Sequence, residues 1–184
     1  MNEPTIKIRP AWAGDAPALA RVHIDAWRTT YRGILPAEGL AGLSYERREH
    51  WWNEVLALVP EQRHVVFVAE DQAGRVVGFS SAGREPSGDP VYNAELYAIY
   101  ILEEYQRRGL GSRLMHAAVD GLVQTGYTTM LLWVVADNVG SRRFYEMLGG
   151  RVIREKPIEI FGVTVAEVSY GWDDLATLVA ATAP

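Results

Sequence analysis

The stretch Gln106-Arg107-Arg108-Gly109-Leu110-Gly111 follows an apolar segment over residues 95–102. Apolar residues then recur at every fourth position up to Leu122, which predicts a helix over 109–125. A helix N-terminus presents unpaired N–H groups and a partial positive charge, and glycines let the backbone approach an anion closely. A strand, a glycine turn and a helix in this order can therefore hold a pyrophosphate, with two arginines adding phosphate contacts.

Taken alone, the same string could be a plain connection between a strand and a helix, in which the glycines only allow tight packing. It is not a P-loop, because no Gly-Lys-Ser/Thr follows Gly111. It is not a complete dinucleotide fingerprint either, since only two of the three expected glycines are present.

Periodicity elsewhere predicts a mixed sheet covered by helices, which places the chain in the α/β class. We expect a single domain over 1–184 with its core at about 5–172. It should contain a mixed, mostly antiparallel sheet of about seven strands flanked by about four helices. The expected strands are 5–9, 64–69, 75–82, 95–102, 129–135, 151–160 and 163–172. The expected helices run from Asp15 to Thr30, from Ser44 to before Pro60, over 109–125 and from Ser141 to Leu148, and Asp173 could cap a short last helix.

Composition narrows the possible functions. The chain has 184 residues, a formal net charge of −5 and no cysteine. This excludes disulfides, thiolate metal sites and a covalent thiol mechanism, and it offers no basic field for nucleic acid. The four histidines lack the spacing of metal ligands, so no metal is predicted. Without an apolar signal segment or membrane-length apolar run, we expect a cytoplasmic protein with no membrane partner.

A second stretch lies downstream, Asn138-Val139-Gly140-Ser141-Arg142-Arg143-Phe144-Tyr145-Glu146-Met147-Leu148-Gly149. It resembles the pattern Asn-x-x-Ser/Ala-x-x-Phe-Tyr-x-x-x-Gly, while Gln106–Gly111 resembles Gln/Arg-x-x-Gly-x-Gly/Ala. Both are motifs of the GCN5-related N-acetyltransferase (GNAT) superfamily, and their separation by one helix and one strand is also that of the superfamily. One departure is Gly150, where an aromatic residue is usual.

The resemblance implies a GNAT-type fold and an acetyl-CoA-dependent N-acetyltransferase that uses acetyl-CoA as its cosubstrate. Because the chain has no thiol nucleophile, the simplest route is direct attack in a ternary complex by a primary amine, of a small molecule or of a peptide or protein N-terminus. Strands that diverge should open the space where thioester and amine meet. The residues expected at the cofactor are Tyr100, Ile101, Leu102, Gln106, Arg107, Arg108, Gly109, Leu110, Gly111, Ser112, Asn138 and Ser141.

Two residues are candidates for the chemistry. Tyr145 occupies the tyrosine position of the superfamily and could donate to the departing thiolate, or be a core aromatic beside Phe144. A tyrosine pKa lowered by the helix end would ease that donation. Glu95 could be the base, act through water, orient a neutral amine, or be an ordinary strand glutamate. Period-2 alternation places Glu95 on one strand face with Tyr97, Ile99 and Ile101.

Aromatic side chains could line the acceptor site or pack in the core. Trp27 and Tyr31 are neighbours on one helix face and are the stronger candidates, together with Tyr97 on the predicted strand. Two rival functions remain open: a CoA-binding sensor of the same fold, and an unrelated phosphate-binding α/β protein. The exposed strands near the C-terminus could support a homodimer.

Overall fold

The computed structural model describes residues 6–58 and 63–182. In chain order the helices and strands are β1 (Lys7–Pro10), α1 (Ala16–Thr30), α2 (Ala37–Ala41), α3 (Tyr45–Leu58), β2 (Val65–Glu70), β3 (Val76–Arg84), β4 (Ala94–Ile101), α4 (Leu110–Gln124), β5 (Met130–Val135), α5 (Val139–Met147), β6 (Arg151–Ile160), β7 (Val163–Trp172) and α6 (Leu175–Thr182).

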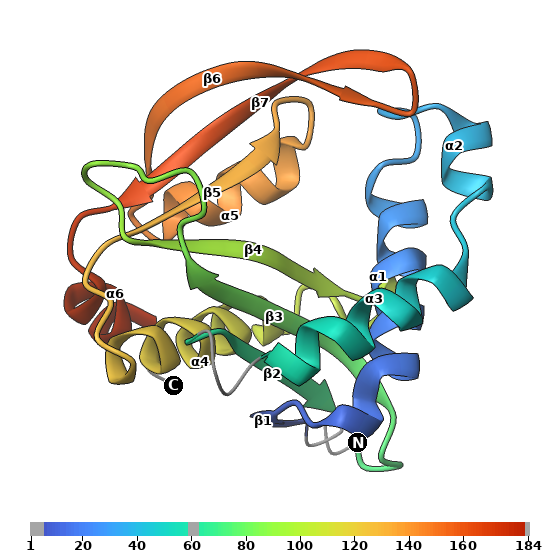
Figure 1. Ribbon diagram of the computed structural model, residues 1–184, viewed down its shortest axis with the longest axis horizontal. Helices are drawn as coiled ribbons and strands as arrows, with labels where there is room; N and C mark the ends of the chain where they lie inside the picture. The colour runs from blue at the N-terminus through green and yellow to red at the C-terminus, as the bar shows by residue number, and fades with distance from the viewer. Residues whose placement is uncertain (1–5, 59–62, 183–184) are drawn as a thin grey trace.

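The seven strands form one sheet in the order β1-β2-β3-β4-β5-β7-β6. Every described pair is antiparallel except β4 with β5, which confirms the mixed, mostly antiparallel sheet. β4 and β5 pair only at Ala94 with Met130 and at Glu95 with Leu131. Beyond those positions β4 continues along β3 and β5 along β7, so the two central strands diverge, as Figure 1 shows.

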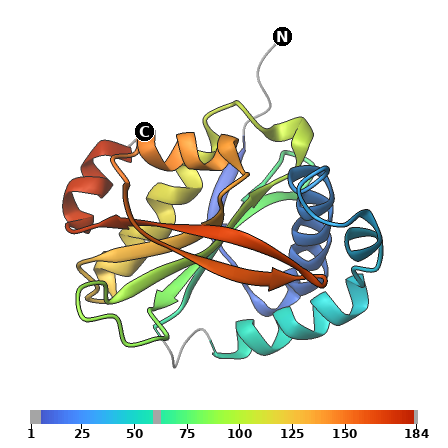
Figure 2. The same ribbon diagram turned by 90° about the horizontal axis from the view of Figure 1, so that it is seen from above.

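Helices cover the two faces of this sheet. Phe79 of β3 packs beneath α1, whereas the next residue, Ser80, donates a hydrogen bond to the carbonyl oxygen of Leu114 in α4. Since successive strand residues point to opposite faces, α1 and α4 lie on opposite sides. Figure 2 shows the sheet between α1, α2 and α3 on one side and α4, α5 and α6 on the other.

One short helix, α2, adds to the expected set, and the short last helix begins close to where it was expected. α2 spans only Ala37–Ala41, too short to produce a readable helical period. α6 begins at Leu175, and its first turn is capped by Asp174, which accepts from the N–H of Ala176, and not by Asp173 as expected. Ser44 does cap α3, because its hydroxyl accepts from the N–H of Arg47 at 3.2 Å. The expected strand start at Thr5 and helix stop at Pro60 lie outside the described residues.

A bulge in β4 corrects the expected strand face. Ala82 pairs with Leu96 but Ser81 pairs with Ala98, so Tyr97 is an extra residue. Ile99 and Ile101 pair with Ser80 and Gly78, which face α4. Glu95 pairs with Gly83, whose open side meets the ring of Tyr97. Glu95 and Tyr97 therefore lie on the α1 face, and the prediction that Ile99 and Ile101 share it is wrong.

The β6–β7 hairpin bridges the two halves of the molecule. Phe161 at its turn packs against Gly39 of α2 and edge-on to Trp27 of α1, with ring centroids 6.3 Å apart. Tyr31, Leu35, Leu40 and Val135 form a buried cluster there, joined by Tyr100, Ile160 and Val165. The hairpin thus passes across the region where β4 and β5 diverge (Figure 2).

Candidate active site

The loop between β4 and α4 has the backbone of an anion site. Gly109 is the N-cap of α4 with φ +72°, in the left-handed region that glycine adopts at little cost. Within the part of the chain that the structure describes, no side chain caps this N-terminus, and no acidic residue lies in its first turn. The N–H groups of Leu110, Gly111 and Ser112 therefore open the helix without an internal acceptor. Leu110 is buried, so only its backbone can face a ligand.

The side chains of the loop divide into two roles. Gln106 donates from its amide nitrogen to the carbonyl oxygen of Ile101 at 2.9 Å, which ties the loop to the end of β4. Its side chain is thus occupied by the protein itself. Arg107 has φ +58° and is exposed, and the exposed guanidinium of Arg108 stacks 5.8 Å from the ring centroid of Tyr105. The two arginines remain available for phosphate oxygens.

The second motif starts α5. The side-chain oxygen of Asn138 accepts from the N–H of Ser141 at 3.2 Å, so these two residues form the N-cap of the helix. Further along α5, the ring of Phe144 lies against Gly111, which brings the two motifs into contact. Asn138 also lies beside the hydroxyl of Tyr31, across the gap between β5 and α1.

The departure at Gly150 has a packing cause. A Cβ there would lie 2.6 Å from the indole of Trp172 in β7, so only glycine fits. Trp172 donates from its Nε1 to the carbonyl oxygen of Leu148 and fills this space with an aromatic ring from another strand. The aromatic group is therefore supplied by β7 in place of the residue after Gly149.

Three tyrosines from different elements meet where the central strands diverge. The hydroxyls of Tyr31 and Tyr100 are 3.5 Å apart. Tyr145, from α5, is buried against Phe144, Tyr170 and Trp172. Burial, followed by the electrostatic influence of Tyr31, raises the pKa of Tyr145 well above its ordinary value. A lowered pKa, which would have eased proton donation, is therefore not found at Tyr145.

Glu95 has the electrostatics of a group that can exchange protons near neutral pH. Burial, followed by the charges of Glu85 and Glu167, raises its pKa to about 7, and Lys156 opposes them. Glu85 itself stays charged: burial opposes ionisation, but hydrogen bonds from the N–H of Asp89 and from Ser87 hold its pKa below the usual value. The sequence pattern gave no sign that these groups surround Glu95.

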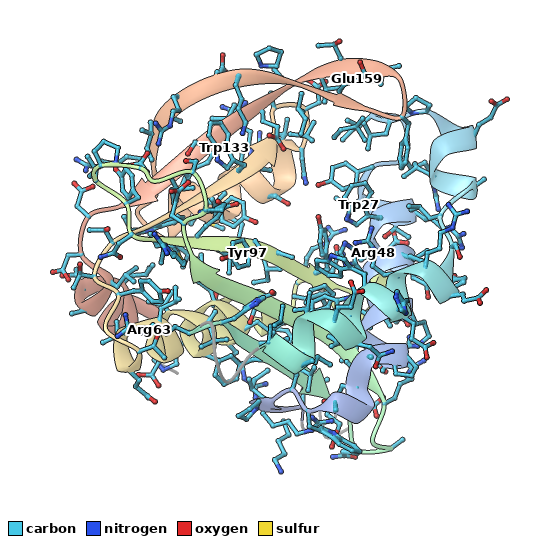
Figure 3. All side chains as sticks on the ribbon, in the orientation of Figure 1. Trp27, Arg48, Arg63, Tyr97, Trp133 and Glu159 are labelled. Atoms are coloured by element: carbon cyan, nitrogen blue, oxygen red, sulfur yellow. The ribbon has the colours of Figure 1, made fainter. Side chains whose placement is uncertain are left out.

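The β6–β7 hairpin contributes residues that no motif indicated. The ammonium of Lys156 lies 3.8 Å from the ring centroid of Trp133 in β5 and 3.9 Å from the carboxylate of Glu167. Figure 3 shows Trp133 and Tyr97 on the two sides of the gap between β4 and β5. Tyr97 was predicted to line the site of the amine substrate. Its hydroxyl donates to the carbonyl oxygen of Arg84, so mainly its ring is left to contact a substrate.

The two aromatic candidates of α1 lie beside the same region. Trp27 and Tyr31 pack on each other with centroids 4.9 Å apart, and Tyr31 is buried. Trp27 also contacts the hairpin turn, so it serves packing there as well. Among residues 6–58 and 63–182, no group of histidine, aspartate and glutamate side chains could hold a metal ion. No described helix is long and apolar enough to cross a membrane.

Comparisons with known proteins agree with this geometry. Residues 23–149 match the model of the acetyltransferase (GNAT) family. The uncharacterized N-acetyltransferase YuaI of Bacillus subtilis is 39% identical over 173 residues, which cover 94% of this chain and 96% of that protein. A probable N-acetyltransferase of Mycobacterium tuberculosis, Rv2775, is 27% identical over 92% of this chain and 95% of its own.

Solved structures share the fold. The PaiA N-acetyltransferase from Thermoplasma acidophilum in complex with coenzyme A superposes with a TM-score of 0.73 at 20% identity, covering 91% of this chain and 99% of that one. The family match spans both motifs, the diverging strands and the helix between them. The chain therefore belongs to the acetyltransferase (GNAT) family and is an acetyl-CoA-dependent N-acetyltransferase.

Proposed function

We propose that this enzyme moves the acetyl group of acetyl-CoA to a primary amine by direct attack, with Glu95 as the base and Tyr145 as a hydrogen-bond donor to the sulfur. The observation that carries the proposal is the pKa of Glu95, about 7, beside the point where β4 and β5 diverge. A base that titrates near the working pH is effective, whereas an ordinary glutamate is a poor match for an ammonium.

The donor is proposed to lie along the open edge of β4. That edge has no β5 partner beyond Glu95, so an amide-containing arm could lie along Tyr100, Ile101 and Leu102 as another strand would. The carbonyl oxygen of Ile101 already accepts from Gln106 and the N–H of Leu102 donates to Val77, so the arm would bond the backbone groups that remain. The pyrophosphate would then reach the N-terminus of α4, with Arg107 and Arg108 beside it. Asn138 and Ser141 act there chiefly by holding α5, and through it Phe144 and Tyr145, in position.

The neutral amine nitrogen attacks the thioester carbon, a C–N bond forms, and the C–S bond breaks as the tetrahedral oxyanion collapses. The amine loses a proton to Glu95, and the thiolate leaves while accepting a hydrogen bond from Tyr145. An ammonium has a pKa near 10.4, about six pKa units above that of an ordinary glutamate. With a pKa of about 7, Glu95 lies only about three pKa units below the ammonium. Transfer with Glu95 as the base therefore requires an acceptor amine of which a fraction is already unprotonated.

Release of free thiol from acetyl-CoA with a panel of primary amines tests the proposal. We expect turnover with at least one amine, accompanied by an N-acetylated product of the corresponding mass. Tight CoA binding without turnover for any amine would instead indicate the sensor.

Gly109→Val is expected to weaken CoA binding at least about tenfold. A side chain at φ +72° is strained, and its branches would occupy the space that an anion needs. Isothermal titration calorimetry with CoA measures the effect. Gly88→Val is the matched control, since Gly88 has φ +77° and nothing within 4 Å of its Cβ position but lies in the β3–β4 loop. Equal affinity in both variants would show that the N-terminus of α4 does not bind the pyrophosphate.

A further inference from the structure

Lys156 of β6 presents a primary amine beside the candidate active site. Its ammonium lies 3.8 Å from the ring centroid of Trp133 in β5 and 3.9 Å from the carboxylate of Glu167 in β7. The side chain is 49% exposed, and a lysine stem is flexible, so the amine can leave the ring without disturbing the core. The proposed reaction acetylates a primary amine, and Lys156 carries one.

Strand register places this amine on the same face of the sheet as Glu95. Glu95 pairs with Leu131 of β5, and Trp133 lies two residues further along, so the three side chains point to one side. The ammonium of Lys156 lies over the ring of Trp133 and is therefore on that side too. Two residues of a strand span about 7 Å, a distance that a change of lysine rotamer can cover.

The charges agree with this placement. Burial raises the pKa of both Glu95 and Glu167, and the charge of Lys156 opposes the rise in each case. Such an effect requires that the ammonium lies within electrostatic range of both carboxyl groups. Glu95, the proposed base, can accept a proton from this nitrogen once a rotamer change brings the two groups into contact.

The residue type at this position suits a reacting group better than a packing cation. The chain has 18 lysine and arginine residues, and only Lys7 and Lys156 are lysines. Arginine stacks on aromatic rings more often than lysine does, so packing on Trp133 alone would favour arginine. Arg154 of the same strand already lies 5.8 Å from the centroid of that ring. Lysine differs from arginine in having an amine that becomes a nucleophile when it loses its proton.

We propose that the enzyme acetylates its own Lys156, with the acetyl-CoA bound between β4 and β5 as the donor. This inference rests on the proposed function and adds an acceptor within the chain itself. The ammonium first loses one proton, and its neutral nitrogen attacks the carbonyl carbon of the thioester. The C–N bond forms, the C–S bond breaks, and CoA leaves as the thiolate. The nitrogen gives its second proton to Glu95 and ends as a neutral amide.

The other lysine supplies an internal reference for the test. Lys7 is exposed on β1, at the opposite edge of the sheet from β6. Figure 1 shows these two strands at opposite ends of the molecule. Acetyl-CoA in solution can react slowly with any exposed lysine, whereas only Lys156 lies beside the proposed donor site. The ratio of acetylation at Lys156 to that at Lys7 therefore separates the enzymatic reaction from the background.

Incubation of the full chain with acetyl-CoA, without an added amine, tests the inference. Peptide mass spectrometry follows the acetyl group at each lysine over time. We expect Lys156 to be acetylated at least about tenfold faster than Lys7, because a bound donor raises the local concentration. Excess CoA should slow acetylation of Lys156 and not of Lys7. Gly109→Val, which is expected to weaken CoA binding, should lower the ratio in the same way, and Lys156→Arg should leave only the acetylation of Lys7 and of the N-terminal amine.

Three results would overturn the inference. Equal rates at Lys156 and Lys7 would show a background reaction only. Acetylation of Lys156 that resists both excess CoA and Gly109→Val would not come from the bound donor. A rate per molecule that rises with protein concentration would show transfer between copies and not within one chain.

The same samples separate this inference from the proposed function. Thiol release with the panel of amines is measured beside the acetylation of Lys156. Turnover of a free amine with Lys156 unmodified overturns the inference and leaves the proposed function standing. Acetylation of Lys156 without turnover of any free amine supports the inference, while transfer to a separate amine fails.

Discussion

Replacing Tyr145 with Phe is expected to slow turnover by about 100-fold or more while leaving the affinity for CoA within about twofold. The ring remains and keeps its packing against Phe144 and Trp172, but the hydroxyl proposed to face the departing sulfur is lost. Single-turnover and steady-state thiol release measure the rate, and calorimetry measures the affinity.

The raised pKa of Tyr145 decides how it acts. A free tyrosine is already a weaker acid than a thiol, and burial makes this one weaker still. Full proton transfer to the thiolate would be uphill, so we expect a hydrogen bond that stabilises the charge as it develops. The hydroxyl of Tyr145 should consequently not titrate during turnover. We therefore expect the rate to depend on pH in the same way in the unchanged enzyme and in the Phe variant.

Tyr170→Phe is the matched control for this experiment. Tyr170 is a buried tyrosine 6.0 Å from the ring of Tyr145, and its hydroxyl donates to Glu146 at 2.6 Å. Losing that hydroxyl should cost stability of about 1 kcal/mol with little change in kcat. Comparable losses of kcat in both variants would mean that the Tyr145 effect is structural. An unchanged rate in Tyr145→Phe would remove it from the chemistry.

The Glu95→Gln enzyme is expected to lose about 100-fold in kcat/KM at pH 8. Glu95 must be ionised to accept a proton, and its pKa is about 7. In the unchanged enzyme, kcat/KM should therefore fall about tenfold per pH unit below pH 7 and level off above it, apart from the ionisation of the acceptor itself. A glutamine side chain cannot titrate, so only the acceptor's ionisation should remain in that variant.

Neighbouring charges supply the controls for the pH profile. Glu167→Gln removes a negative charge that raises the pKa of Glu95, so the limb near pH 7 should move to lower pH. Lys156→Met removes a positive charge that lowers it, so the limb should move to higher pH. A limb that persists unchanged in the Glu95→Gln enzyme belongs to another group and would exclude Glu95 as the base.

The elements that sequence could predict are those whose signals are local. The helical spacing after Gly109, the Ser44 cap and the β6–β7 hairpin bounds all match the structure, because each depends on neighbours a few residues apart. The loop proposed to bind phosphate was found for the same reason. The sequence did not predict how the side chains of this loop are used, since Gln106 donates a hydrogen bond to the carbonyl oxygen of Ile101.

The sequence pattern could not predict contacts between residues that come together only on folding. The bulge at Tyr97 moves Ile99 and Ile101 to the opposite face, and nothing in β4 alone marks where an extra residue will be left unpaired. Lys156 and Glu167 reach Glu95 because the hairpin crosses the gap between β4 and β5.

The sequence by itself determined the family and the donor, because two motifs with short fixed spacings carry that information, and its periodicity gave the order of the strands and of the longer helices. Only the tertiary structure shows the surroundings of the residues that are proposed to act in the chemistry. A pKa depends on burial and on charges close in space, and those charges come from distant parts of the chain. The pKa of Glu95 is raised only because long-range packing removes its carboxyl group from water and brings Glu85 and Glu167 close to it.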